Sequence, residues 1–113
     1  MSRKASGLKA WAIQRATAIY IALFLLYFIV ALMSAAPADY AGWKAWFSAP
    51  SMSLATLLFV ISILMHAWVG VRDVLIDYVQ PIGLRTGLLS LVALVLVACG
   101  AWAAQALTLV RLV

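Results

Sequence analysis

His66 is the only histidine in the sequence, and it lies inside an apolar run about six residues before the charged residue Arg72. At 1.5 Å per helical residue, this spacing puts the imidazole roughly 9 Å below the polar end of the run. An ionisable side chain at that depth in an apolar segment usually faces a partner, a cavity or a cofactor. His66 is therefore a candidate ligand for a bound group.

The residues around His66 are spaced so that they share one face of a helix. Ser62, His66, Gly70, Asp73 and Asp77 follow one another at intervals of four, four, three and four residues. Ser62 and Gly70 are small, and they would leave clearance for a flat macrocycle such as haem bound through His66. The same small residues are also typical of a helix that a neighbouring helix approaches closely, with His66 as a hydrogen-bonded packing residue. Spacing alone leaves both interpretations open.

Three other side chains near the ends of apolar runs have chemistry that a redox site could use. Arg15 can bind a carboxylate through both arms of its guanidinium, or it can simply set the orientation of a membrane helix. Tyr78 can donate a hydrogen bond to the carbonyl of a ligand, or it can anchor the helix at the membrane surface. Asp77 beside it can order water and relay protons, or it can balance nearby cations in a solvated segment.

The elements that must position these residues are three long apolar runs, which predict transmembrane helices over about 16–36, 51–71 and 86–110. Each run is long enough to cross a bilayer, since this takes roughly 20 residues. The first is too long for the apolar part of a secretory signal, so we expect it to be retained. Residues 37–50 are bounded by prolines and rich in aromatics, which predicts an interfacial belt with a short surface helix. The predicted fold is an all-α integral membrane protein, with one domain over 1–113.

Composition excludes several classes of protein. Of the 113 residues, 68% are hydrophobic and 10% are charged, whereas about a quarter of the residues in a soluble globular protein are charged. The net charge of +5 does not indicate nucleic-acid binding, because the basic residues mark the ends of the apolar runs. The single cysteine, Cys99, excludes an internal disulfide and an iron–sulfur site built from this chain alone. Its place within an apolar run predicts a buried thiol.

The distribution of basic residues predicts the orientation of the chain. Six of them lie in the N-terminal segment or near the loop after the second run: Arg3, Lys4, Lys9, Arg15, Arg72 and Arg85. Two, Lys44 and Arg111, lie on the other side. The positive-inside rule therefore puts the N-terminus in the cytoplasm and the C-terminus on the periplasmic side. Arg15, Asp77 and Tyr78 would then meet at the cytoplasmic face, with His66 beneath them.

Two motifs carry a resemblance to a known family. His66, Gly70, Asp77 and Tyr78 form the pattern H-x3-G-x6-D-Y, and residues 15–19 read RATAI. Together with the three-run layout, they resemble the small D-type cytochrome b membrane anchor of bacterial succinate dehydrogenase, respiratory complex II, over nearly the whole chain. The resemblance implies a multi-pass subunit of the bacterial inner membrane that is not catalytic alone. It would anchor a flavoprotein and an iron–sulfur subunit and help form the ubiquinone-reduction site, in the respiratory chain and tricarboxylic acid cycle.

The resemblance also implies roles for individual residues. His66 would be one axial ligand of haem b, and a companion cytochrome b anchor subunit would supply the other, because this chain has no second histidine. Arg15 would pair with a haem propionate, and Lys9, which stands where related proteins often carry a histidine, is a second candidate for that contact. Tyr78 would bind the quinone, with Asp77 in the quinone site or a proton relay. Two alternatives stay open: the anchor of a related fumarate reductase or other haem b complex, and a structural membrane subunit without a cofactor.

Overall fold

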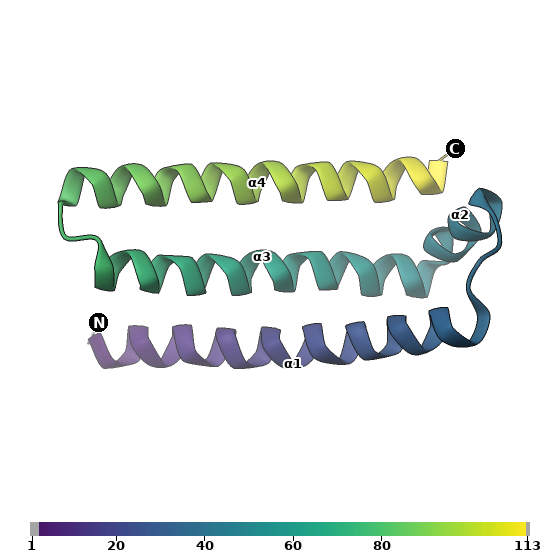
Figure 1. Cartoon of the computed structure of the whole chain (residues 1–113), viewed down its shortest axis with the longest axis horizontal. Helices are drawn as coiled ribbons and strands as arrows, with labels where there is room; N and C mark the ends of the chain where they lie inside the picture. The colour runs from purple at the N-terminus through teal and green to yellow at the C-terminus, as the bar shows by residue number, and fades with distance from the viewer. Residues whose placement is uncertain (1–2, 113) are drawn as a thin grey trace.

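The computed structural model describes residues 3–112, which form four helices and no strand. They are α1 (Arg3–Ala35), α2 (Tyr40–Ser48), α3 (Pro50–Tyr78) and α4 (Ile82–Leu112), as Figure 1 shows. Among them, three stretches are long and apolar enough to cross a membrane: Gly7–Ala35, Pro50–Tyr78 and Ile82–Arg111. The all-α prediction and the three predicted spans are confirmed.

The helices extend beyond the apolar runs that predict the spans. The basic N-terminal segment continues α1 as far back as Arg3, and α4 begins at Ile82, before the predicted third span. The apolar run marks what can lie in lipid, but a helix continues until a residue interrupts its hydrogen bonds. Pro81 separates α3 from α4, and Pro37 follows the end of α1. The charged segment from Arg72 therefore stays helical as far as Tyr78, beyond the predicted second span.

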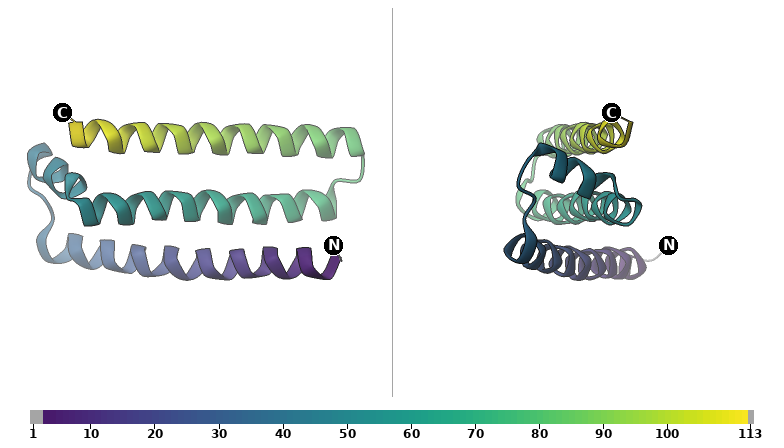
Figure 2. Two further views of the ribbon diagram at one scale, coloured as in Figure 1. Left: turned by 180° about the vertical axis from the view of Figure 1, so that it is seen from behind. Right: turned by 90° about the vertical axis from the view of Figure 1, so that its right-hand side faces the viewer.

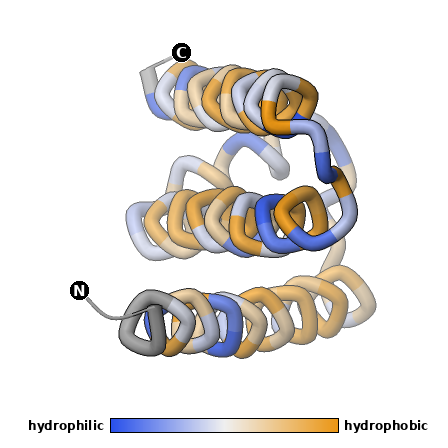
Figure 3. Tube along the Cα trace, turned by 90° about the vertical axis from the view of Figure 1, so that its left-hand side faces the viewer, coloured by the Kyte–Doolittle hydropathy of each residue, from blue (hydrophilic) through white to orange (hydrophobic). Residues whose placement is uncertain are grey.

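The three long helices lie in one row, with α3 in the middle. Within the described chain α3 contacts both α1 and α4, whereas α1 and α4 do not contact each other. The end-on views show this row directly (Figures 2 and 3). The molecule measures 51 × 25 × 24 Å. Because α1 and α4 flank α3 on two opposite sides, the other two sides of α3 stay accessible on the broad faces of the layer.

The layer has two distinct ends, which are visible in Figure 1. We call them the Tyr78 end, with the start of α1, the end of α3 and the start of α4, and the α2 end, with α2 and the C-terminus. At the Tyr78 end the guanidinium Nε of Arg85 donates to the carbonyl of Val79 at 2.9 Å, which fixes the short α3–α4 turn. At the α2 end the Asp39 carboxylate caps α2 by accepting from the amide of Gly42 at 2.9 Å.

Aromatic side chains join α1, α2 and α3 near the α2 end. Phe24 is buried and stacks on Phe59 of α3, with ring centroids 4.4 Å apart. Phe28 stacks on Trp46 of α2 at 5.4 Å. The Tyr20 hydroxyl donates to the carbonyl of Ala55 at 2.7 Å. The short helix predicted within residues 37–50 is confirmed. Its sequence has the aromatic composition expected of an interfacial belt, and its aromatic side chains also pack on α1.

Most apolar side chains are exposed in the isolated chain. Leu23, Leu94 and Val97 are 60%, 68% and 69% exposed, and Figure 3 shows hydrophobic residues along all three long helices. Such a surface suits lipid and partner helices. The predicted burial of Cys99 is wrong for this chain, since its thiol is exposed on α4. The reason is that α4 lies at the edge of the row and turns much of its surface away from α3.

Candidate functional site

His66 is held from α1 by a buried threonine. The Thr17 hydroxyl oxygen lies 3.1 Å from Nδ1 of His66. The same hydroxyl lies 2.6 Å from the carbonyl oxygen of Ile13 and 3.2 Å from that of Gln14, one turn earlier in α1. A hydroxyl has one proton, and the carbonyls can only accept it. Thr17 therefore donates to the backbone of α1 and accepts from Nδ1–H of His66, which leaves the lone pair on Nε2.

The second ring nitrogen of His66 faces Gln14. The side-chain nitrogen of Gln14 lies 3.5 Å from Nε2, longer than the usual 2.9–3.0 Å of an N–H hydrogen bond. The other side-chain atom of Gln14, Oε1, is buried without a hydrogen-bond partner. Sequence reasoning missed Gln14 and the contact of Thr17. The available signal was that Gln14 and Thr17 are polar, three residues apart and thus on one face of α1.

His66 opens onto a groove of about 320 Å³, which we call the His66 groove. Its lining consists of Gln14, His66, Ala67, Gly70, Val71, Val74 and Leu75. A methyl group added at Gly70 would meet only the Gln14 amide nitrogen, at an ordinary 3.6 Å. No described helix therefore packs closely against Gly70. Within this chain Gly70 leaves open space next to His66, which favours the clearance interpretation on that side, whereas Ser62 does not line the groove.

The two candidate propionate partners lie on different sides of the α1–α3 contact. Arg15 lines a groove with Gln14, which also lines the His66 groove. The Arg15 guanidinium carbon lies 5.8 Å from the centre of the Trp11 ring. Lys9 instead lines a groove with Met65 and Trp68, apart from both Gln14 and His66. Neither side chain lines the His66 groove itself, but the groove of Arg15 shares Gln14 with it, whereas the groove of Lys9 shares no residue with it.

The predicted quinone residues lie in the last turn of α3 and point outward. Tyr78 is 80% exposed, and Asp77 is exposed as well. Within the described chain, neither of these two side chains forms a hydrogen bond with another residue. Asp73, on the same helix, pairs with Arg72 at 3.0 Å, but the two side chains are 53% and 35% exposed, so the pair contributes little. Asp77 and Tyr78 are therefore available to groups outside this chain.

His66 is the only lining residue of its groove whose side chain commonly binds a metal. Residues 7–111 contain no cluster of three or more histidine, cysteine, aspartate or glutamate side chains. His66 offers one oriented nitrogen beside an open groove, with the cation Arg15 nearby.

Comparison with known proteins agrees with this geometry. Residues 1–104 match the family described as succinate dehydrogenase/fumarate reductase transmembrane subunit. The chain is also 37% identical over 105 residues to the succinate dehydrogenase hydrophobic membrane anchor subunit of Coxiella burnetii (strain RSA 493 / Nine Mile phase I), which covers 93% of this chain and 91% of that protein. With three spans and these matches over most of its length, the chain belongs to the family of transmembrane subunits of succinate dehydrogenase and fumarate reductase.

Proposed function

We propose that this chain is the hydrophobic membrane anchor subunit of a bacterial succinate dehydrogenase. Its family and its 37% identity to a succinate dehydrogenase anchor support this assignment. The flavoprotein and iron–sulfur subunits would oxidise succinate and pass electrons inward, and this chain would anchor them in the inner membrane. The subunits that co-purify with it distinguish this role from that of a fumarate reductase anchor.

We further propose that His66 is an axial ligand of haem b, shared with a companion cytochrome b subunit. The observation that supports this most directly is the contact between Thr17 and Nδ1, because it leaves the Nε2 lone pair for a metal. Haem iron between two strong axial ligands is a one-electron carrier. The fit is also supported by the open space over Ala67 and Gly70. The amide of Gln14, which lies weakly against Nε2, would be the group that moves aside.

Arg15 would bind a haem propionate, since a guanidinium pairs with a carboxylate in a bidentate manner. Its groove shares Gln14 with the His66 groove, which supports this assignment over Lys9. The Lys9 contact stays a prediction, and it would need the propionate to reach the other side of α1.

Tyr78 and Asp77 would contribute to the ubiquinone-reduction site at the cytoplasmic end. The exposed phenol can donate a hydrogen bond to a quinone carbonyl, and the neighbouring carboxylate can relay protons. Because both side chains point away from the chain, the remaining walls of the site would come from the companion and iron–sulfur subunits. The N-terminus would lie in the cytoplasm, as the basic residues predict.

The experiment that tests the haem assignment is His66→Ala in the purified, intact complex. We expect loss of haem and of the reduced-minus-oxidised spectrum, with all four subunits still present. A haem content and spectrum equal to those of the unmodified complex would reject His66 as a ligand.

A further inference from the structure

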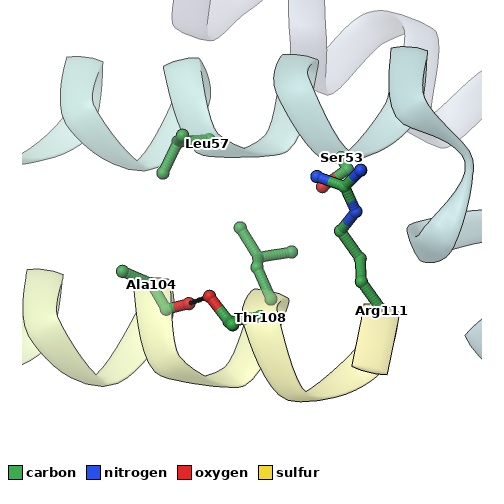
Figure 4. A pocket seen from close by; sticks show the side chains of 6 residues that line it. Ser53, Leu57, Ala104, Thr108 and Arg111 are labelled. Atoms are coloured by element: carbon green, nitrogen blue, oxygen red, sulfur yellow. Dashed lines mark hydrogen bonds between the residues drawn. The ribbon is translucent and has the colours of Figure 1, made fainter. Parts of the chain in front are cut away.

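A second groove lies between α3 and α4 at the α2 end, far from His66. It has a volume of about 400 Å³ and is lined by Ser53, Leu57, Ala104, Leu107, Thr108 and Arg111. Figure 4 shows these side chains facing one another across the two helices. Arg111 and Ser53 lie at the outer end, in the last turn of α4 and the first turn of α3, and the leucines lie further along the spans. The groove is therefore polar at the membrane surface and apolar inside.

Contacts at both ends keep this groove open. At its inner end α3 and α4 meet so closely that a methyl group added at Gly100 would lie 2.7 Å from the Leu64 side chain. One turn further along α4, Ala104 lines the groove and is too small to fill it. At the outer end the Ser48 hydroxyl lies 2.5 Å from the carbonyl oxygen of Lys44 in its own helix and 3.1 Å from that of Val110, which brings α2 against α4. The open space is thus bounded by the contact of α3 with α4 at its inner end and of α2 with α4 at its outer end.

Arg111 brings a positive charge to this groove, and the described chain supplies no counter-charge there. Its guanidinium points toward Ser53 in Figure 4. The sequence contains three acidic residues. Asp73 pairs with Arg72, Asp77 lies in the last turn of α3, and Asp39 caps α2. Among the residues that the structure describes, no salt bridge joins Arg111 to a carboxylate.

We propose that this groove binds one membrane phospholipid. The phosphate would pair with Arg111, whose guanidinium fits phosphate oxygens in a bidentate manner, and would accept a hydrogen bond from Ser53. One acyl chain would lie along Leu57, Ala104 and Leu107. The order of polar and apolar groups along the groove matches that of a phospholipid at the bilayer surface. A purely apolar occupant would leave the cation unpaired, and a partner helix would have to bring its own carboxylate.

The test is site-specific photocrosslinking in the intact complex within native membranes. A diazirine amino acid replaces Leu107, which lines the groove, or Leu94, which is 68% exposed on α4 outside it. We expect a phospholipid adduct at position 107, identified by its mass. In complexes that also carry Arg111→Gln, this adduct should fall about tenfold, which corresponds to about 1.4 kcal/mol of lost charge-assisted bonding. The adduct at position 94 should not change.

Two results would overturn the proposal: a polypeptide adduct at position 107, or a phospholipid yield there that is the same with and without the arginine. Arg111→Lys keeps the charge but loses the bidentate geometry, and it should give an intermediate yield. If complexes with Arg111→Gln do not assemble, the adduct yield with Arg111→Lys tests the proposal in their place. The test is independent of haem, since the groove and the His66 groove lie at opposite ends of the layer and share no lining residue.

Discussion

The contact between Thr17 and His66 can be tested by replacing the hydroxyl group of Thr17 with a methyl group. Thr17→Val keeps the shape of the side chain and removes the hydroxyl that accepts from Nδ1–H of His66. Thr17 is only 8% exposed, so water cannot readily take the place of the hydroxyl. The change should leave α1 helical, because the hydroxyl only adds to the backbone hydrogen bonds of that helix. The imidazole would lose the partner that fixes its tautomer.

The expected magnitude follows from that single hydrogen bond. Leaving one buried donor unpaired costs about 1–3 kcal/mol, and losing the partner of a metal-binding histidine typically weakens metal binding by about 10- to 100-fold. We therefore expect the complex with Thr17→Val to release haem at least about tenfold more readily on dilution in detergent. The haem midpoint potential should rise, because an imidazole without this acceptor is a weaker donor and stabilises the oxidised iron less.

Haem content and a potentiometric titration of the purified complex measure both effects. Thr17→Ser keeps the hydroxyl and should behave like the unmodified complex. Ser90→Ala is a control for the loss of such a hydroxyl, since the Ser90 hydroxyl donates to a carbonyl one turn earlier, that of Thr86 at 2.8 Å, but lies on α4, which does not contact α1. If Thr17→Val and Thr17→Ser retain haem equally and titrate at the same potential, the tautomer argument is refuted, even if His66→Ala abolishes haem.

Three further predictions concern other parts of the fold. Gly70→Leu should fill the His66 groove and lower the haem content of an assembled complex, whereas Gly70→Ala should leave the chain's own packing intact, since the added methyl meets its neighbour at 3.6 Å. Tyr78→Phe should lower quinone reductase activity about tenfold, the effect of losing one hydrogen bond of about 1.4 kcal/mol, with haem unchanged. Gly100→Ala should lower the thermal unfolding temperature only slightly, because the added methyl would lie 2.7 Å from Cδ1 of Leu64, the flexible end of a side chain that lines an open groove and can shift.

Each of these has an outcome that contradicts it. Normal haem in Gly70→Leu would mean that nothing bulky occupies the space above that residue. Unchanged quinone kinetics in Tyr78→Phe would remove the phenol from the site. For the packing prediction, Gly87→Ala on the same helix is the control, since a methyl there meets nothing within 4 Å. A much lower unfolding temperature for the Gly100 variant than for the Gly87 variant would show that Leu64 cannot shift to make room for the methyl.

The sequence by itself determined the three spans, because the length and hydropathy of an apolar run are local properties. It also determined that His66 lies at depth in the second span, since this depends only on helical rise. The end of α3 near Pro81 was predictable too, because proline interrupts the helix whatever surrounds it. The family resemblance rested on short motifs in these same segments.

Only the tertiary structure decided which side chains meet. A helix in lipid is apolar on most of its surface, so its pattern does not say which face contacts a neighbour. The meeting of Gln14 and Thr17 with His66 follows from how α1 is rotated against α3, and so does the choice of which α1 residues line each groove with α3. The groove beside Arg111 likewise depends on where α3 and α4 touch and where they stay apart. These are contacts between residues distant in sequence, and only the packing of whole helices fixes them.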